Sequence, residues 1–470
     1  MRSSSFFKGI SFLLVLNVLV KPIWIFFIDR QIQNQVGHEA YGKYFAVLSL
    51  SYILIFIADA GLTNMMNQRL ANHEIFHVRQ YLKFKLILSA FYLIACCFIA
   101  WITNMQQWEI LFYVIGIQLL TSLFVFLRNI ITAHQLFTAD AWFSVTDKAL
   151  VILLCAGFIY YPTAFGSISI TLFLKIQFFC TAFAALVAFL FLAKQQLLVS
   201  GSRENVSAIV KAVAPFAAII LLMSMHYRMD GFLLERIHSN GAYETGVYAM
   251  GYRLLDATNM VGYLAASFLV PFIARHQQQK QVVENAIANI RHVLIFFGIG
   301  IASFSLMFAP WIEQLLYHSN DAYHSKVIQL CVAALPAYLL VHVYGSVLTA
   351  TAKFKAFILI LVASVVINVI LNLVFIPSMG ALGCCVAALV SQYFCALACY
   401  AVATKKLQLP FITKSSVLYL LTATGLSLFF YFASLSALNV WFILGLAICF
   451  MTVLLITQVS YIKKLFLQLY

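Results

Sequence analysis

The stretch Asn368-Val-Ile-Leu-Asn372-Leu-Val-Phe-Ile-Pro377-Ser-Met-Gly380-Ala-Leu-Gly383-Cys-Cys-Val-Ala387 joins two apolar runs, 354–376 and 381–403. Each run is long enough for a helix that crosses a ~30 Å hydrocarbon core, which takes about 20 residues. Pro377 and Gly380 mark the break between the runs, because neither residue continues a helix well. We therefore predict two spanning helices joined by a tight turn.

The same pattern fills the whole chain. Of its 470 residues 64% are hydrophobic and 9% are charged, whereas a soluble domain is roughly one quarter charged, so a soluble fold is excluded. Only helices or closed barrels satisfy the backbone inside a bilayer, and runs of this length indicate helices. Cutting the runs at charged, Pro, Gly and Asn clusters predicts an all-α polytopic membrane protein with about fourteen spans. The expected spans are 9–28, 41–63, 81–103, 109–131, 142–161, 167–193, 209–228, 244–273, 291–312, 326–350, 354–376, 381–403, 413–433 and 437–460.

The first of these runs has the charge pattern of a signal peptide. Arg2 and Lys8 precede the apolar run from Gly9 to Val20. No small-residue cleavage site follows, and Lys21-Pro22 leads into further apolar sequence. We therefore expect a retained first helix.

The net charge of +14 does not indicate nucleic-acid binding, because the basic residues punctuate membrane spans instead of forming a solvated surface. Most of the 29 Lys and Arg, Lys85 and Arg291 among them, fall in segments on one side, which the positive-inside rule assigns to the cytoplasm. This predicts a multi-pass membrane protein with both termini cytoplasmic, and the family resemblance described below implies a bacterial inner membrane. The outer segments hold only Arg30, Lys43, Arg228, Arg236 and Lys326.

Signals for cofactors or catalysis are missing from the sequence. The ten cysteines, such as Cys96-Cys97 and Cys384-Cys385, lie in apolar runs without a CxxC metal pair and are expected to pack as small buried side chains. No phosphate loop of the form G-x-x-x-x-G-K-[ST] occurs, and no connecting segment has room for a soluble domain. We expect no cofactor and no metal.

A short motif occurs twice. Glu39-Ala-Tyr-Gly42-Lys-Tyr44 opens the second expected span and Arg69 closes it, while Glu244-Thr-Gly246-Val-Tyr248 opens the eighth and Arg275 closes it. Two copies of one six-helix unit explain this pattern, and an even number of spans between the copies makes the repeat parallel. The expected division is an N-terminal lobe at 1–200, a C-terminal lobe at 201–404, and two additional helices with a cytoplasmic tail at 405–470.

These stretches resemble a known family, the polysaccharide flippases of the O-antigen translocase type within the multidrug/oligosaccharidyl-lipid/polysaccharide exporter superfamily. The resemblance covers about residues 1–404, and the stretch Asn368 to Ala387 is its most specific part. Cys384-Cys385 replaces the usual pair of small residues there, a conservative packing change. The other matching segments are Gly42-Lys-Tyr-Phe, Ala58-Asp59-Ala-Gly61-Leu62, Asp230-Gly-Phe-Leu-Leu, Gly246-Val-Tyr248 and Pro271-Phe-Ile-Ala-Arg275.

The resemblance implies two six-helix lobes around a central cavity and transport by alternating access. It implies a polyprenyl-pyrophosphate-linked glycan as cargo, carried from the cytoplasmic to the outer leaflet, and no enzymatic activity. Membrane lipid and other polysaccharide-assembly membrane proteins are the further partners expected.

Basic residues inside spans are the candidate binding residues. A Lys or Arg near a helix centre costs ~2.5 to 3.5 kcal/mol on insertion scales, so such residues are expected to face a wet cavity. A pyrophosphate there would accept charge-assisted hydrogen bonds from them. The resemblance implies the same for cations on the first and eighth helices, which correspond to Lys21 and Arg253. The predicted substrate-binding cations are Lys21, Lys148, Lys175 and Arg253, with Asn17, Arg30, Asp59 and Asp256 as accessory candidates.

Structural explanations compete with this hypothesis. Arg253 and Asp256 are also consistent with a structural ion pair, and Asp147-Lys148 with a snorkelling pair at the interface. Snorkelling is the favoured explanation for Arg128, and a loop charge for Arg30. Asp59 is expected to cap or bond the turn after its span, with ion coupling as the alternative.

Two stripes of mostly polar residues at helical spacing also allow a functional or a structural role. They either line the cavity or hold helices together, which is also the expected role of Asn368 and Asn372. Spans nine to fourteen contain no Lys or Arg beyond their first two residues by these boundaries. The stripes are Gln118, Ser122, Val125, Asn129 and Thr132 on span four, and Ser49, Tyr52, Phe56, Asp59 and Thr63 on span two.

Three other functions compete with a polysaccharide flippase. A membrane enzyme needs polar catalysts gathered at one aqueous face, and only Asp29 and Glu39 flank the first outer segment. A multidrug exporter of the same superfamily fits the fold, but cavity cations favour an anionic cargo. A lipid II flippase for peptidoglycan fits cationic cavities and fourteen helices equally well.

Overall fold

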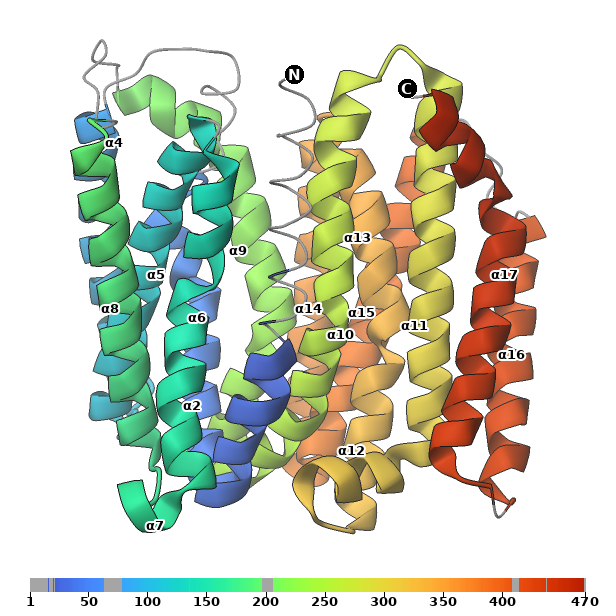
Figure 1. Ribbon diagram of the computed structural model, residues 1–470, viewed down its shortest axis with the longest axis horizontal. Helices are drawn as coiled ribbons and strands as arrows, with labels where there is room; N and C mark the ends of the chain where they lie inside the picture. Colours follow the sequence, from blue (N-terminus) through green and yellow to red (C-terminus); the bar gives the residue numbers. More distant parts are fainter. Residues whose placement is uncertain are drawn as a thin grey trace. The chain divides into compact units, whose positions relative to one another are not determined.

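The computed structural model describes residues 22–62, 78–134, 136–196, 206–407, 414–436 and 438–468, together with Leu16 and Val20. Every regular element in these ranges is a helix (Figure 1). In chain order the elements are η1 (Trp24–Asp29), α2 (Arg30–Asp59), α4 (Val78–Ile102), α5 (Trp108–Ala133), α6 (Phe137–Tyr160), α7 (Pro162–Phe165), α8 (Ile170–Lys194), α9 (Val206–Ile237), α10 (Gly241–Arg275), α11 (Lys280–Tyr317), α12 (Ala322–Ala333), α13 (Leu335–Ala350), α14 (Phe354–Met379), α15 (Ala381–Leu407), α16 (Lys414–Ser434) and α17 (Val440–Gln468).

The length and composition of these helices define a multi-pass membrane protein. Twelve helical segments of the described chain are long and apolar enough to cross a membrane, and Val440–Leu455 is a shorter apolar helix. This agrees approximately with the fourteen spans expected. Most of the first expected span, 9–28, lies outside the described residues.

The chain forms two compact units. The first ends at Gly246 and the second begins at Val247, so the division falls inside α10. The lobe boundaries expected from the sequence, at residues 200 and 404, remain a prediction.

The N-terminal part of the first unit corrects one expectation. The segment 29–40, predicted as an outer connection, is helical, because the π-helix η1 runs directly into α2. Only Gly37 departs from helical geometry, with φ 80° and ψ 168°, a conformation that glycine adopts without steric cost. Arg30 and Lys43 therefore lie in a helix and not in a loop.

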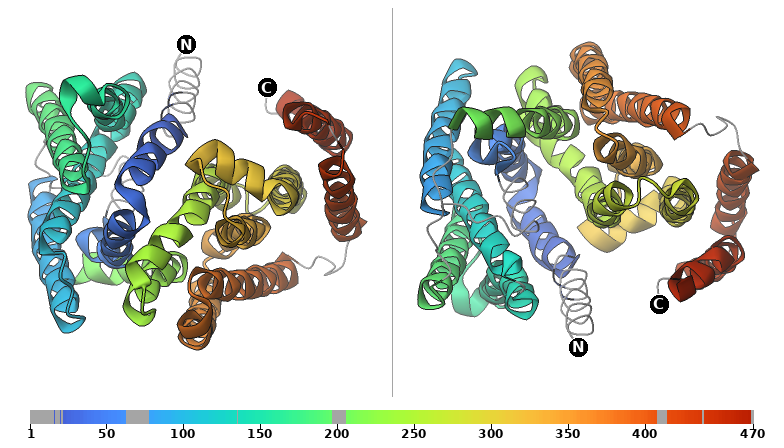
Figure 2. Two further views of the ribbon diagram at one scale, coloured as in Figure 1. Left: turned by 90° about the horizontal axis from the view of Figure 1, so that it is seen from below. Right: turned by 90° about the horizontal axis from the view of Figure 1, so that it is seen from above.

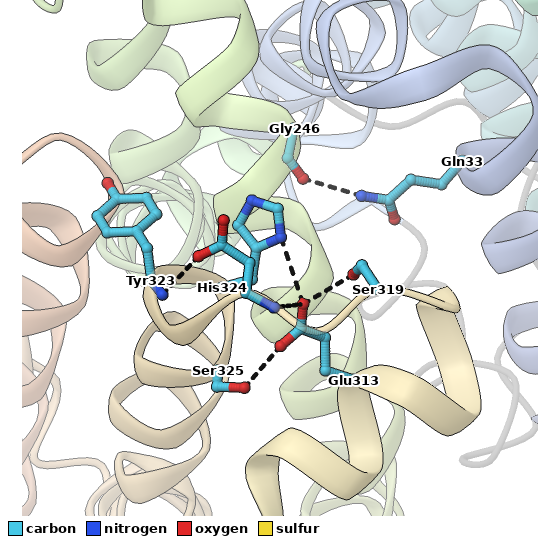
Figure 3. Close-up of polar contacts among 8 residues, drawn as sticks. Gln33, Gly246, Glu313, Ser319, Tyr323, His324 and Ser325 are labelled. Carbon is cyan, nitrogen blue, oxygen red and sulfur yellow. Dashed lines mark hydrogen bonds and ion pairs between the residues drawn. The ribbon is translucent and has the colours of Figure 1, made fainter.

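The two glycines of the repeated motif lie at one helix crossing. A Cβ on Gly42 of α2 would lie 1.8 Å from the carbonyl oxygen of Ala242, and one on Gly246 would lie 2.0 Å from the carbonyl oxygen of His38. The backbones of α2 and the first turns of α10 are therefore in direct contact. The Gln33 side-chain amide, which donates to the Gly246 carbonyl at 2.8 Å, adds a hydrogen bond there (Figure 3).

The stretch from Asn368 to Ala387 forms the hairpin of α14 and α15 in the second unit. Gly380 ends α14 with φ 56°. A Cβ on Gly383 would lie 2.7 Å from the Phe375 carbonyl, so the two helices approach closely at this point. The Asn368 amide donates to Ser391 Oγ across the hairpin at 3.3 Å, and Asn372 donates to Asn368 at 3.1 Å. The expected helix-bonding role of Asn368 is confirmed, whereas the bond from Asn372 to Asn368 lies within α14.

The last two helices pack on α11 within the second unit (Figure 2). Ile295, Ile299 and Phe308 of α11 are buried against residues of α16 and α17, among them Phe430 and Ile443. Apolar packing in the second unit therefore extends to the C-terminal helices.

A buried carboxylate closes the turn from α11 to α12 (Figure 3). Glu313 is fully buried, and its oxygens accept from Ser319 Oγ at 2.7 Å, Ser325 Oγ at 2.6 Å and the Asp321 backbone N–H at 3.0 Å. His324 Nδ1 lies 3.4 Å from the same carboxylate. These donors offset the cost of burying the charge.

The cysteines pack as expected. Eight of the ten are buried and Cys97 is half-buried, while Cys449 on α17 is exposed. Cys384 and Cys385, which depart from the family pattern, are among the buried residues.

Candidate functional site

The predicted cations are distributed over several helices. Lys148 lies in α6 and Lys175 in α8 of the first unit, while Arg253 lies in α10 of the second. Asn17 and Lys21 lie outside the described residues.

Lys148 lies beside η1, in aromatic surroundings. Its ammonium lies 5.0 Å above the Trp24 ring, and Trp24 stacks on Phe173 of α8 at a centroid distance of 5.7 Å. Its only described carboxylate contact is with Asp147, at 3.5 Å. The Lys148 side chain is 30% exposed and the Asp147 side chain 9%. The lysine thus has a loose ion pair, a cation–π contact and an accessible surface.

The π-helical geometry of η1 is a second unusual feature beside Lys148. Such segments are rare and occur frequently at functional sites. Tyr160 at the end of α6 donates to the Phe27 carbonyl of η1 at 3.0 Å, which holds η1 against α6. Asp29, the last residue of η1, is buried and accepts from Tyr41 Oη at 2.8 Å. The next residue, Arg30, is half-buried.

Lys175 lies on an exposed face of α8. Its ammonium lies 6.0 Å from the Tyr113 ring, and no carboxylate among the described residues pairs with it. The exposed face continues as large apolar side chains at helical spacing: Phe179, Phe183, Leu186 and Leu190. A lysine five residues from a helix start can snorkel from such a face. Exposure alone therefore does not distinguish a cavity position from a lipid-facing one, and its binding role remains a prediction.

Asp59 pairs with a lysine that the positive-inside rule assigns to the cytoplasmic side. This lysine, Lys85, lies in α4 with its side chain 2% exposed, and its Nζ lies 2.7 Å from Asp59 Oδ1. Nζ also donates to Ser122 Oγ at 2.9 Å and lies 5.6 Å from the Phe126 ring. The predicted polar stripes of spans two and four therefore contribute one residue each to a buried ion-pair site. Asp59 thus bonds a lysine of a neighbouring helix, and its expected bond to the following turn remains a prediction.

Two further arginines of the first unit differ from expectation. Arg128 does not simply snorkel, because its Nε lies 2.8 Å from Asp140 Oδ1. Arg228, expected in an outer segment, lies inside α9, with its guanidinium 4.6 Å from the Tyr52 ring. Helix α9 ends at Ile237, well past the end expected for this span at residue 228.

Arg253 and Asp256 lie three residues apart on α10, and both are half-buried. Their spacing places them on neighbouring positions of one helix face. Whether Arg253 binds cargo or pairs structurally with Asp256 remains a prediction for mutagenesis.

The same fold occurs in solved membrane transporters. The lipid II flippase MurJ, in an inward closed conformation, aligns over 99% of this chain and 100% of its own, with a TM-score of 0.64 and 12% identity. An inward-facing MATE family multidrug resistance transporter of the MOP superfamily covers 84% of this chain and 94% of its own, with a TM-score of 0.59 and 15% identity. The Vibrio cholerae MATE transporter VcmN, in its bent form, covers 88% and 98%, with a TM-score of 0.57 and 14% identity.

Comparison with protein-family models and with curated protein sequences finds no match. At identities this low, structural likeness establishes the fold and not the cargo. The chain therefore shares the fold of these solved transporters, which agrees with the all-α fold class expected from the sequence.

Proposed function

We propose that this protein is a flippase that carries a polyprenyl-pyrophosphate-linked oligosaccharide from the cytoplasmic to the outer leaflet of a bacterial inner membrane. The proposal combines the fold with the distribution of charge inside the spans. Lys148 is the residue of the first unit that we propose as a contact for the pyrophosphate, and Arg253 is the one in the second.

One contrast among the intramembrane cations supports this choice. Lys85 and Arg128 lie 2.7 Å and 2.8 Å from carboxylate oxygens, so their charges are used inside the protein. Lys148 is 3.5 Å from Asp147 and remains 30% exposed. A phosphate oxygen that displaces this loose contact gains a short charge-assisted hydrogen bond. Accessible cations favour an anionic cargo over the cationic drugs considered as an alternative.

The test is transport by purified protein in proteoliposomes that contain a fluorescent polyprenyl-pyrophosphate oligosaccharide. We expect Lys148→Gln to lower the initial rate at least about tenfold, the effect of losing ~1.4 kcal/mol. Lys148→Arg should restore most of the rate, because it keeps the charge. A wild-type rate for Lys148→Gln would exclude the proposed role.

Asp147→Asn is the matched control, because it keeps the cation and removes its carboxylate. We expect it to transport at least as fast as the natural protein. If it loses activity as fully as Lys148→Gln, the pair is structural and the headgroup role is wrong. Alanine substitution of Lys21 and Arg253 together, assayed at matched protein levels, extends the test, and undiminished transport would count against both residues.

A lipid II flippase is the second candidate, and one observation favours it. The MurJ structure aligns over 99% of this chain, while the two MATE structures reported above align over 84% and 88%. Complementation separates the candidates. Rescue of a strain depleted of its lipid II flippase would favour peptidoglycan precursor transport, and rescue of a polysaccharide flippase mutant would favour the first proposal.

A further inference from the structure

The second unit contains a cavity of about 490 Å³ between α11, α13, α15 and α16. This is within the ~300 to 1,000 Å³ range of small-molecule sites. One end of the cavity is polar and the rest is almost wholly apolar. The lining therefore suits an amphiphilic ligand, with a polar headgroup at one end and an apolar chain along the rest of the cavity.

The polar end is built around Arg291 of α11. Its Nη1 donates to Tyr344 Oη at 3.0 Å and its Nε to Tyr419 Oη at 3.1 Å. Tyr419 Oη also lies 2.8 Å from Nδ1 of His292, so the hydroxyl accepts from the arginine and can donate to the imidazole. Tyr400 completes this end, with its ring 4.9 Å from that of Tyr344. Two tyrosines thus hold the guanidinium in place without neutralising it.

Arg291 has no carboxylate partner in the part of the chain that the structure describes. Its polar contacts there are the two tyrosine hydroxyls, which leave part of its five-donor fork unused. Arginine stays protonated in proteins, so the cavity contains a permanent positive charge. Arg291 is half-buried, so its charge is partly desolvated without an anion beside it, and an anionic ligand would offset that cost.

The apolar part runs along one face of α11 away from Arg291. Ile295, Ile299, Ala302 and Leu306 follow it at helical spacing and line the cavity. From position 291 to position 306 a helix rises about 22 Å, more than the ~15 Å depth of one leaflet's hydrocarbon. A chain attached to a head at Arg291 therefore has an apolar path through its leaflet.

We propose that this cavity is a binding site for a membrane phospholipid whose single phosphodiester charge pairs with Arg291. Charge complementarity selects this occupant. Arg291 is the one basic residue among the lining residues that the structure describes, which matches one negative charge, whereas a pyrophosphate carries more than one. The site lies wholly within the second unit and does not depend on the proposed cargo.

The position of Arg291 along its helix supports a lipid headgroup. It lies near the beginning of α11, which starts at Lys280, and α15 ends with Lys405 and Lys406 in its last turn. Basic pockets at the cytoplasmic ends of membrane helices attract anionic headgroups. The lysines would raise the local concentration of such lipids, and the guanidinium would bind one.

Native mass spectrometry of the full-length protein in mild detergent tests the proposal, with phosphatidylglycerol as the probe. We expect the natural protein to retain one phosphatidylglycerol, and Arg291→Gln to bind it at least tenfold more weakly. The matching diacylglycerol, which lacks the phosphate, should not compete. Lys355→Gln is the control for general attraction to basic residues, because Lys355 is exposed at the start of α14, and it should bind as the natural protein does.

Three results would overturn the proposal. Equal retention by Arg291→Gln would exclude the headgroup contact. Inorganic phosphate binding as tightly as phosphatidylglycerol would indicate a site for a free anion. Preferential displacement by undecaprenyl pyrophosphate would assign the cavity to a cargo lipid.

A second variant covers the case in which Arg291→Gln does not fold. Ala423→Phe fills the apolar part and leaves Arg291 and its tyrosines unchanged, because Ala423 is a half-buried lining residue on α16. We expect this variant to lose the retained lipid while its unfolding temperature in lipid-free detergent stays the same. Undiminished retention would overturn the proposal independently.

Discussion

Lys85 is more deeply buried than Asp59, so removal of either partner should change the free energy of unfolding by a different amount. The Lys85 side chain is 2% exposed, whereas the Asp59 side chain is 26% exposed. Asp59→Leu would leave a buried ammonium without its carboxylate, and we expect a loss of about 3 to 5 kcal/mol in the free energy of unfolding. Lys85→Met should cost less, because the remaining carboxylate is closer to water.

The double variant Asp59→Leu with Lys85→Met is the control in that experiment. A buried ion pair replaced by apolar residues of similar volume is often close to neutral. Equilibrium unfolding in mixed micelles, analysed as a double-mutant cycle, measures the coupling. Additive losses in the double variant would contradict a direct interaction.

The surroundings of single charges near span ends are the features that the sequence predicts least well. Lys85 and Arg291 both lie near the start of an expected span, 81–103 or 291–312, and the positive-inside rule therefore assigns them to the cytoplasmic side. In the structure Lys85 is buried beside Asp59, whereas Arg291 lies half-buried inside α11 beside two tyrosine hydroxyls. Hydropathy reports the composition of a run but not the partner that a neighbouring helix supplies. The expectation that spans nine to fourteen hold no Lys or Arg beyond their first two residues is therefore wrong at Arg291, which lies inside α11.

Helix α12 begins with a cap that gives stability a defined pH dependence. Asp321 is the N-cap, and the backbone N–H of Tyr323 donates to its carboxylate at 2.7 Å. This hydrogen bond lowers the pKa of Asp321 from its usual value. The folded state thus binds this proton more weakly than the unfolded state. The cap's contribution is present above the unfolded pKa of ~3.9 and is lost as the pH falls through the lowered folded pKa.

We therefore expect Asp321→Ala to cost about 1 kcal/mol at neutral pH, and the difference from the natural protein to shrink as the pH falls below about 4. Asp321→Asn should be nearly neutral and should remove the pH dependence, since asparagine also caps helices. Denaturant unfolding of the three proteins across this pH range is the measurement. A difference that grows on acidification would show that the sign is wrong.

The crossing of α2 with the start of α10 predicts the effect of a single methyl group. A Cβ at position 42 would overlap the Ala242 carbonyl oxygen, so Gly42→Ala must push the two backbones apart. We expect a loss of at least about 2 kcal/mol, within the usual range of overpacking costs. Thermal unfolding and folded yield measure it.

Gly425→Ala is the matched control for that substitution. No atom lies within 4 Å of a Cβ at Gly425 on α16. The change should be neutral or stabilising by up to about 1 kcal/mol, because alanine is the better helix former. Similar losses in both variants would mean that the crossing does not explain the cost at Gly42.

Orientation in the membrane is the prediction that belongs to the whole molecule. The positive-inside rule predicts cytoplasmic termini, and Lys405 and Lys406 in the last turn of α15 belong to the same side. Alkaline phosphatase, which is active only after export, can be fused behind Lys406, His318 or the C-terminus. We expect activity only behind His318. Activity of the C-terminal fusion would reverse the orientation.

The presence of many membrane-spanning helices is the feature that the sequence predicts best. Long apolar runs specify spans without knowledge of their partners, because the bilayer imposes the same length on each of them. The hairpin of Asn368 and Gly383 could also be predicted, since its bonds are local. The environment of Lys148 could not, because Trp24 comes from an element far away in the sequence.

The distribution of thiols offers a practical route to watching the C-terminal region. Cys449 is the exposed cysteine on α17, while the other nine are buried or half-buried. An uncharged maleimide dye that partitions into bilayers should therefore label the natural protein predominantly at one position. Its emission would report on the surroundings of α17 during turnover, with no residue engineered into the chain.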